Sequence, residues 1–459
     1  MGKYQTYSEY RSWNNKWISC LPASWQLVPL KYICSGFVKD GPHETPKFTD
    51  DGIPFLSVDG IQDNKLVFNG CRYISEEDHV RYSMKCHPKQ GDVLLGKAAS
   101  VGKVAYVDSN MDFNVWSPLA VITAKSNKYG KYIYYCLQSS MLQAQCEIFA
   151  NSNTQKNLGM NTIDNLDMPL PSEHEADVIT NFLDHETAKI DTLIEKQQQL
   201  IKLLKEKRQA VISHAVTKGL NPQAPMKDSG VEWLGEVPEH WVVSRLGFHT
   251  LKIGSGKTPK GGAEVYQKEG VLFLRSQNVY DDGLRISESE SVYISESIHD
   301  EMRTTKVFGG DILLNITGGS IGRTCLVPLE FIEANVNQHV CIIRVPDCLR
   351  EFISMVLKST PIKEQIGAIQ TGGNREGLNF EQISKFSFAL PPESERDEIV
   401  QSVKTSLAKL DALEEQSNRA IKFMQERRTA LISAAVTGKI DVRNWQVPPS
   451  QDQALEQTA

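Results

Sequence analysis

The chain of 459 residues has a formal net charge of −6 at pH 7, with 40% hydrophobic and 23% charged residues. These fractions are typical of a soluble globular protein, and the length is sufficient for two domains with a core each. The mild acidity counts against nucleic acid as a partner, although an acidic chain can still carry basic clefts.

The nine cysteines contain no CxxC pair, which argues against a disulfide framework or a cysteine zinc module and for reduced thiols. The N-terminus lacks the order of a signal peptide, and no apolar run approaches the ~20 residues that span a bilayer. We therefore expect a cytoplasmic protein with no membrane partner.

Residues 1–171 are predicted to form a globular domain. Strand-like runs at 53–58 and 92–95 alternate with clusters of Gly, Asn, Asp and Ser, which is typical of short strands joined by turns. An amphipathic helix is expected at 129–148, packed against the sheet. The predicted fold class is therefore α+β.

A long helix is predicted for residues 172–217. Glu173, Glu175 and Asp177 lie in its first turn, where the helix dipole favours negative charge. Apolar residues then recur at spacings of three and four, which favours a coiled-coil seam over a single helix lying on a globular core. The seam residues predicted in this helix are Ile190, Leu193, Ile201, Leu204 and Val211, with the polar Gln197 among them.

The rest of the chain repeats this order. After a Pro- and Gly-containing linker at 218–240, a second domain is predicted at 241–391, with an amphipathic helix at 349–366, then a second long helix at 392–437 and a tail at 438–459. The two long helices align without a gap at an offset of 220 positions, which places the second seam at Leu410, Leu413, Ile421, Met424 and Leu431. Because each helix follows its own domain, we expect the two helices to form an antiparallel coiled coil. A period this long excludes a solenoid and indicates a duplicated unit with two related surfaces.

Several motifs occur once in each half. A WL-x3-P-x2-W pattern at 233–241 has a weaker copy at 17–25, Thr-Pro-Lys occurs at 45–47 and 258–260, and Gly-Asp-(Val/Ile)-Leu-Leu occurs at 91–95 and 310–314. Together with the order domain–helix–domain–helix, these motifs resemble the specificity (S) subunit of type I restriction–modification enzymes over nearly the whole chain. The resemblance implies two mixed α/β target recognition domains in tandem. It also implies that the two long helices are spacers that carry the modification subunits.

Polar loops in each half are candidates for DNA contacts. Lysine, arginine and small hydroxyl residues in glycine-rich turns can contact phosphates, whereas Asn, Gln and Arg can read base edges. The candidates are Lys47, Lys97, Ser100, Lys103, Thr154, Gln155 and Lys156 in the first half, and Lys257, Lys260, Arg275, Gln277, Asn278, Thr317, Ser320, Arg323, Asn374 and Arg375 in the second. A plain surface turn, hairpin or polar loop is the alternative for each of these segments.

Signatures of catalysis are missing from the sequence. It contains no Asn/Asp-Pro-Pro-Phe/Tyr methyltransferase motif, no helicase motif, no HExxH and no close His/Cys ligand spacing. The Gly-Ser-Gly-Lys-Thr run at 254–258 resembles the end of a phosphate-binding loop, but Leu251 replaces the first glycine and Pro259 disfavours a helix after it. We therefore predict a non-catalytic DNA-binding subunit without a metal or cofactor of its own.

The resemblance also implies the partners. The chain is expected to recognise an asymmetric bipartite site in double-stranded DNA. Two modification subunits would supply the S-adenosylmethionine chemistry, and restriction subunits would supply the ATP- and Mg²⁺-dependent chemistry. Two alternatives stay open, namely a coiled-coil adaptor that binds only protein and a truncated fused restriction–modification enzyme.

Overall fold

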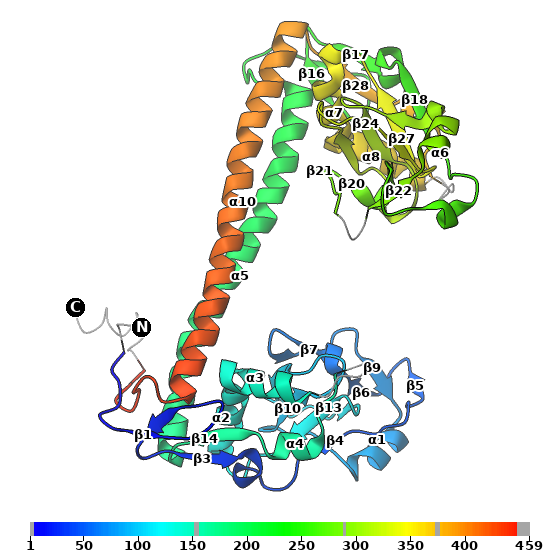
Figure 1. The fold of residues 1–459 in the computed structure, drawn as a ribbon. Helices are drawn as coiled ribbons and strands as arrows, with labels where there is room; N and C mark the ends of the chain where they lie inside the picture. Colours follow the sequence, from blue (N-terminus) through cyan, green and yellow to red (C-terminus); the bar gives the residue numbers. More distant parts are fainter. Residues whose placement is uncertain (1–3, 151–155, 288–290, 372–376, 448–459) are drawn as a thin grey trace, which may run out of the picture. The chain divides into compact units, whose positions relative to one another are not determined.

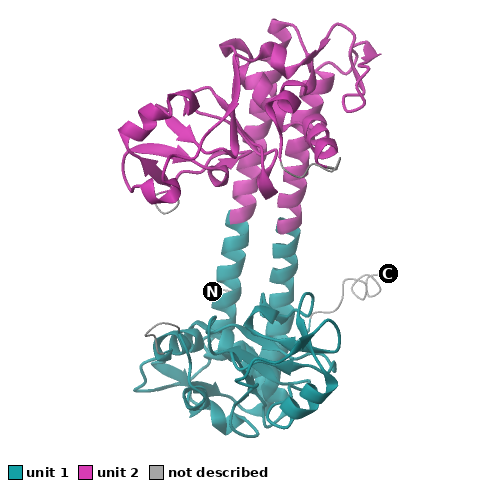
Figure 2. Ribbon diagram, turned by 90° about the vertical axis from the view of Figure 1, so that its right-hand side faces the viewer, with its two compact units in different colours: residues 1–197, 419–459 teal, residues 198–418 magenta. Residues whose placement is uncertain are grey.

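A computed structural model describes residues 4–150, 156–287, 291–371 and 377–447 (Figure 1). The chain divides into two compact units, and each contains one globular domain with parts of both long helices (Figure 2). Unit 1 comprises residues 1–197 and 419–459, and unit 2 comprises residues 198–418. The predicted division set the helices apart from the domains. Each compact unit contains helix ends together with its domain, because the domain buries apolar surface against them.

The domain of unit 1 contains two four-stranded sheets. One is antiparallel with the strand order β11-β10-β13-β4, and the other has the order β12-β6-β9-β5, in which β12 and β6 run parallel. Smaller two-stranded pairs flank them. The elements are β1 (Tyr10–Ser12), β2 (Cys20–Pro22), β3 (Gln26–Pro29), β4 (Lys39–Asp40), β5 (Phe48–Thr49), β6 (Ile53–Leu56), β7 (Ile61–Gln62), β8 (Lys65–Leu66), β9 (Arg72–Ile74), α1 (Glu76–Ser83), β10 (Val93–Gly96), β11 (Val104–Tyr106), β12 (Asn114–Val115), β13 (Leu119–Ile122), α2 (Asn127–Gln138), α3 (Ser140–Phe149), α4 (Met160–Asp164), β14 (Asp167–Leu170) and α5 (Glu173–Lys218).

The domain of unit 2 repeats this architecture. Its sheets have the orders β18-β27-β24-β25 and β22-β19-β26-β23, and β19 and β26 form the parallel pair. The elements are β15 (Met226–Asp228), β16 (Glu236–Pro238), β17 (Val242–Arg245), β18 (Lys252–Ser255), β19 (Val271–Leu274), β20 (Val279–Tyr280), β21 (Gly283–Leu284), β22 (Val292–Ile294), α6 (Glu296–Glu301), β23 (Lys306–Val307), β24 (Ile312–Asn315), β25 (Thr324–Leu326), β26 (Ala334–Val336), β27 (Val340–Arg344), α7 (Arg350–Lys358), α8 (Thr360–Thr371), α9 (Phe380–Ser384), β28 (Ser387–Leu390) and α10 (Glu393–Val436). The α+β class and the duplication are confirmed.

The amphipathic helix predicted in each domain is two helices. Ser139 separates α2 from α3 with an extended backbone, and its Oγ accepts a hydrogen bond from Leu142 N in the first turn of α3. Ser359 has the same extended conformation between α7 and α8. A serine that caps a new helix competes with continuation of the old one, and apolar periodicity does not reveal this competition.

The long helices pair antiparallel in each unit. In unit 2, Lys205 and Arg208 of α5 form ion pairs with Glu414 and Asp411 of α10, so residue numbers rise on one helix as they fall on the other. In unit 1, Arg428 Nε lies 2.9 Å from Asp191 Oδ1. The Asp191–Arg428 and Arg208–Asp411 pairs occupy equivalent positions of the two helices, with the arginine and aspartate exchanged between α5 and α10.

Two of the predicted seam residues are wrong. Leu193 and Leu413 are 51% and 46% exposed, whereas Ile190 and Leu204 are buried. Counted from Ile190, the covered positions of the helix are separated by four and three residues in strict alternation. Ile194 and Glu414, which are half-buried, therefore take the seam positions predicted for Leu193 and Leu413. The other predicted seam residues are partly or fully buried: Ile201, Val211, Leu410, Ile421, Met424 and Leu431 lie on the covered faces of their helices.

Each domain also packs on the end of the helix that belongs to the other repeat. In unit 1, Ser140 N donates to Ser433 Oγ of α10 at 2.9 Å, and in unit 2, Thr360 N donates to Ser213 Oγ of α5 at 2.8 Å. The fully buried Trp25 and Trp241 face the glycines that end these helices. The duplicated Trp motif therefore closes each domain onto a helix end.

Candidate DNA-recognition surfaces

The carboxyl ends of two parallel strands define a common edge in unit 1. Val115 of β12 pairs with Leu56 of β6, and Trp116 N donates to Leu56 O at 2.8 Å. Because the strands are parallel, the segments that follow them emerge side by side. A cavity of about 300 Å³ opens here, lined by Phe55, Leu56, Ser57, Val58, Asp59, Gly60, Gln62, Val67, Asn69, Gly70, Cys71, Arg72 and Trp116.

Predicted contact segments of the first half meet near this edge. Lys103, in the turn between β10 and β11, is exposed, and its Nζ donates to Ile61 O at 3.1 Å. Leu158 N donates to Lys97 O at 2.7 Å, which holds the segment after the candidate loop against the same turn. Ser100 in that turn is half-buried. Lys156 is exposed and forms an ion pair with Glu147, whereas Thr154 and Gln155 lie outside the described residues.

Lys97 is not positioned to contact DNA. Its side chain is only 9% exposed, and its Nζ lies 3.3 Å from Asp40 Oδ2. Lys85 Nζ lies 2.7 Å from Asp40 Oδ1, and the exposed His43 Nε2 lies 3.2 Å from Asp40 Oδ2. Burial by itself raises the pKa of Asp40, but the hydrogen bonds and charges of Lys85 and Lys97 outweigh it and leave this pKa below its usual value. The lysine predicted to bind phosphate is therefore an internal ion-pair partner.

Unit 2 has the same edge with different side chains. Leu274 of β19 pairs with Val336 of β26, and Asn337 N donates to Leu274 O at 3.0 Å. Arg275 is half-buried and Gln277 is exposed in the 3-10 turn after β19. Asn278, however, is 2% exposed.

The burial of Asn278 corrects its predicted role as a base reader. Its Oδ1 accepts from Arg275 N and its Nδ2 donates to Arg285 O, both at 2.9 Å. Both the amide oxygen and the amide nitrogen of the Asn278 side chain therefore bond to backbone groups of its own loop. Asn278 therefore holds the turn that presents Gln277.

The glycine-rich turn after β24 lies beside this loop. Asn315 Nδ2 donates to Ser276 O at 2.8 Å and to Ser320 Oγ at 3.1 Å. Thr317 Oγ1 is 2.6 Å from His339 Nδ1. Leu378 N donates to Ile316 O at 2.8 Å, as Leu158 does to Lys97 in unit 1. Asn374 and Arg375, which precede Leu378, lie outside the described residues.

Each Thr-Pro-Lys turn is fixed by a close approach of glycine to the second parallel strand. A Cβ on Gly41 would lie 1.7 Å from Val115 O, and a Cβ on Gly256 would lie 1.8 Å from Val336 O. Only glycine fits such an approach. The turns present Lys47 in unit 1, and Lys257 and Lys260 in unit 2, as exposed side chains. No α-helix begins at Lys257, as expected from Pro259.

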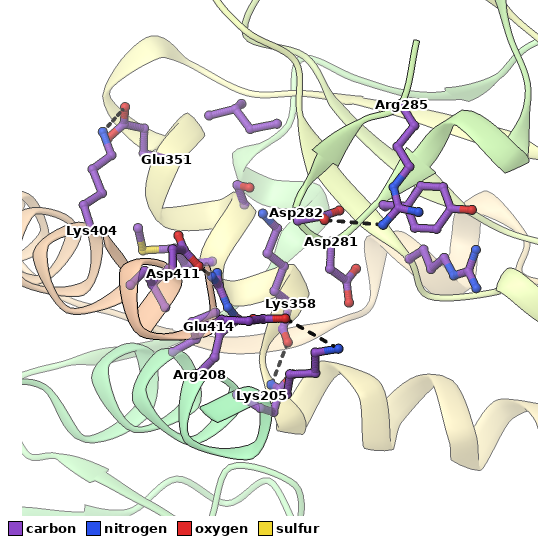
Figure 3. A pocket seen from close by; sticks show the side chains of 18 of the residues that line it. Lys205, Arg208, Asp281, Asp282, Arg285, Glu351, Lys358, Lys404, Asp411 and Glu414 are labelled. Atoms are coloured by element: carbon purple, nitrogen blue, oxygen red, sulfur yellow. Dashed lines mark hydrogen bonds and ion pairs between the residues drawn. The ribbon is translucent and has the colours of Figure 1, made fainter. Parts of the chain in front are cut away.

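A second hollow, in unit 2, lies where β20, β25 and α7 face both long helices (Figure 3). It measures about 820 Å³. The guanidinium groups of Arg285 and Arg323 lie 3.6 and 4.8 Å from the ring centre of Tyr280, in cation–π geometry. Lys358 lines the hollow and forms no ion pair with a residue that the structure describes, and burial lowers its pKa. Arg323 therefore lies at the junction between the predicted turn and this cavity.

Several residues at these edges escaped the sequence analysis. Trp116 of unit 1 and Asn337, Gln338 and His339 of unit 2 follow the second parallel strand, and Tyr280 carries the two arginines. The signal available was a difference after two matched valines: Trp-Ser-Pro follows Val115, whereas Asn-Gln-His follows Val336. This difference points to the edge only once the parallel pairing is known. The two paired strands lie about 60 positions apart in the sequence, and no local pattern predicts that they pair.

Comparison with known proteins assigns the family. The family model described as type I restriction modification DNA specificity domain matches residues 22–203 and 238–422. The chain belongs to this family. It is 21% identical over 443 residues to the type I restriction enzyme EcoKI specificity subunit of Escherichia coli K12, covering 92% of this chain and 90% of that protein. It is 26% identical over 411 residues to the EcoBI specificity subunit of Escherichia coli, covering 85% and 80%.

A solved structure supports the fold. A chain described under the assembly and conformational transition of a type I R-M system superposes with a TM-score of 0.64 at 15% identity, covering 92% of this chain and 99% of that one. The chain is therefore a type I restriction–modification specificity subunit in family and fold.

None of the helices in the described part of the chain is long and apolar enough to cross a bilayer. All nine cysteines are free thiols, and burial raises the pKa of Cys86 and Cys325 to about 12.

Proposed function

We propose that each unit reads one half of an asymmetric bipartite site in double-stranded DNA. The observation that carries this proposal is that the two units share one backbone arrangement at this edge but carry different side chains on it. Both units place a Thr-Pro-Lys turn, a loop after the first parallel strand and a glycine-rich turn at one edge. Ser57 and Asp59 in unit 1 correspond to Arg275 and Gln277 in unit 2. Different hydrogen-bonding groups at one position of a shared scaffold suit two different base sequences.

Exposed apolar residues on the helices support two equivalent docking surfaces for modification subunits. Leu193 of α5 and Phe423 of α10 are 51% and 66% exposed in unit 1. Their equivalents in unit 2, Leu413 of α10 and Leu203 of α5, are 46% and 59% exposed. Apolar side chains that stay about half exposed or more at equivalent positions of both units are suited to a partner. We propose that one modification subunit binds at each pair and that restriction subunits join the assembly.

The same proposal assigns the chemistry to those partners. The chain itself would transfer no methyl group and cut no DNA. S-adenosylmethionine would be bound by the modification subunits, and ATP and Mg²⁺ by the restriction subunits. A native mass of the reconstituted complex tests the docking: Leu193→Ser with Leu413→Ser should release both modification subunits together. A stable one-to-one complex at saturation would contradict two equivalent sites.

Salt-dependent DNA binding distinguishes this function from a protein-only adaptor. The complex with modification subunits should bind DNA with an affinity that falls steeply with salt. Lys257→Ala with Lys260→Ala should reduce the slope of log K against log salt by about 0.9 for each phosphate that the variant no longer neutralises. Lys385→Ala is the matched control, since that exposed lysine pairs with Glu381 on α9. Affinity without salt dependence, or an equal effect of the control, would refute the proposal.

A further inference from the structure

Three side chains in unit 1 bring metal-ligand atoms together outside the edge at the carboxyl ends of β6 and β12, which we call the recognition edge. His79 lies in α1, His87 lies between α1 and β10, and Asp112 precedes β12. One ring nitrogen of each histidine and one carboxylate oxygen all lie within 4.8 Å of one another. His87 Nε2 is 3.1 Å from Asp112 Oδ1, and the two imidazole rings meet edge to face with centres 5.4 Å apart.

The fully buried Asn114 fixes the tautomer of His79. Asn114 Nδ2 donates to Ser83 Oγ at 3.2 Å, and its Oδ1 lies 2.6 Å from His79 Nδ1 and accepts from it. A neutral imidazole that donates from Nδ1 keeps its lone pair on Nε2. Metal-binding histidines are commonly held in this way, by a polar group on the nitrogen that does not ligate the ion.

The second repeat provides an internal comparison. His299 contacts the buried Asn335 in the same manner, and Glu333 precedes that asparagine by two positions, as Asp112 precedes Asn114. Unit 2 has therefore kept the histidine, its orienting amide and the acid.

The third member of the cluster differs between the repeats. The residue five positions before the Gly-Asp aspartate is His87 in unit 1 and Lys306 in unit 2. Lys306 Nζ lies 3.6 Å from Glu333 Oε2 and 3.5 Å from Asp300 Oδ1. An ammonium group neutralises the acid but has no lone pair for a metal ion. Unit 2 thus has an ion pair where unit 1 has a second imidazole.

We propose that His79, His87 and Asp112 bind a divalent transition-metal ion of the zinc class. With ligand bonds of ~2.0–2.1 Å, adjacent donors in a tetrahedral site are about 3.3 Å apart, close to the observed separation of His87 and Asp112. Two imidazoles with one carboxylate suit Zn²⁺ or Co²⁺ and not the all-oxygen shells of Mg²⁺ or Ca²⁺. Water completes the coordination. The ion links α1 to the segments that enter β10 and β12, and it stabilises the sheet below the recognition edge.

Cobalt titration of the full-length chain tests the site. Chain stripped with a chelator and dialysed should bind one equivalent of Co²⁺ with visible d–d bands and without a thiolate-to-cobalt charge-transfer band. Asp112→Asn should weaken binding at least tenfold, and this side chain is 66% exposed, so the fold should be unaffected. His87→Lys, which copies unit 2, should abolish binding. Circular dichroism verifies that both variants are folded.

The matched variants are in unit 2. Glu333→Gln should leave the titration unchanged, and Lys306→His should add a second equivalent of Co²⁺. Absence of saturable binding, a thiolate band, or equal binding by wild type and Asp112→Asn would overturn the proposal.

Discussion

The ion-pair cluster below the recognition edge of unit 1 makes an asymmetric prediction. Asp40 is the common partner of Lys97, which is 9% exposed, and Lys85, which is 49% exposed. Asp40→Asn removes the charge that compensates both lysines. Lys85 can turn to water, but Lys97 is left buried and unpaired. Removing one partner of a buried pair costs about 3–5 kcal/mol. We expect the lower end, about 3 kcal/mol, because water reaches the cluster through Lys85.

Lys97→Met has a much smaller expected effect. Methionine has a similar volume and no charge, and Asp40 keeps its 2.7 Å contact with Lys85. The cost should be below about 1 kcal/mol, because replacing a buried charge by an apolar side chain is often neutral. The double variant should then resemble Lys97→Met and recover most of the stability that Asp40→Asn removes.

Hydrogen exchange followed by mass spectrometry measures this locally. Protection of the β10 and β13 amides should fall about 100-fold in Asp40→Asn, since each 1.4 kcal/mol is a factor of ten. Lys97→Met should change it by less than about fivefold, and the β24 and β27 amides of unit 2 serve as controls. Equal decreases in the two single variants would show that the cost does not come from leaving Lys97 buried without its partner. A Lys97→Met variant with unchanged amide protection but weaker salt dependence of DNA binding would show that Lys97 contacts DNA, and it would contradict the internal role.

The pH dependence of this cluster has a defined sign. Burial raises the pKa of Asp40, but Lys85 and Lys97 together lower it by more than burial raises it. The pKa of Asp40 in the folded chain therefore lies below that in the unfolded chain. Its contribution is therefore complete above the unfolded pKa of about 3.9 and is lost as pH falls through the folded pKa. The difference between wild type and Asp40→Asn should shrink as the pH falls below about 4.

Three further variants test other parts of the fold and surface. Gly438→Ala, at φ +67° with a proline ring 2.4 Å from the new Cβ, should cost about 2–4 kcal/mol in urea unfolding. Gly219→Ala, at φ +75° with Glu395 Oε1 at 3.1 Å and the Trp241 ring at 3.2 Å from the new Cβ, should cost less, about 1–2 kcal/mol, because neither contact is as close. Arg428→Met loses both a carboxylate and an amide partner at 14% side-chain exposure and should destabilise more than Arg208→Met, whose side chain is 29% exposed, when both are compared by urea unfolding. Gln277→Ala should relax one base position of a single half-site by about 1–3 kcal/mol of discrimination without changing the salt slope, and methylation mapping would show this.

The duplication and the long helices could be predicted because they depend on local patterns. The Gly-Asp strands, the acidic first turns and the heptad spacing each carry their own signal within a few residues. The register error at Leu193 arose where two apolar residues compete for one seam position, and burial in the folded pair decides between them. Local pattern therefore predicts elements better than it predicts which face is covered.

The roles of individual site residues could not be predicted in the same way. Lys97 is buried because Asp40, 57 positions earlier in the chain, is brought beside it by the pairing of β4 with β13. Asn278 is buried because its own loop closes around it. Both were selected for residue type, and residue type does not distinguish a side chain that reads DNA from one that holds the loop.

Exchange of a whole recognition domain tests whether each unit reads its own half-site. Residues 26–171 would be replaced by the equivalent domain of another family member, which keeps Trp25 against the end of α10, and the reconstituted methyltransferase complex would be used to map methylated sites. We expect one half-site to change to that of the donor and the other to remain as in the wild type. A simultaneous change of both half-sites, or an unchanged site in an active complex, would contradict it.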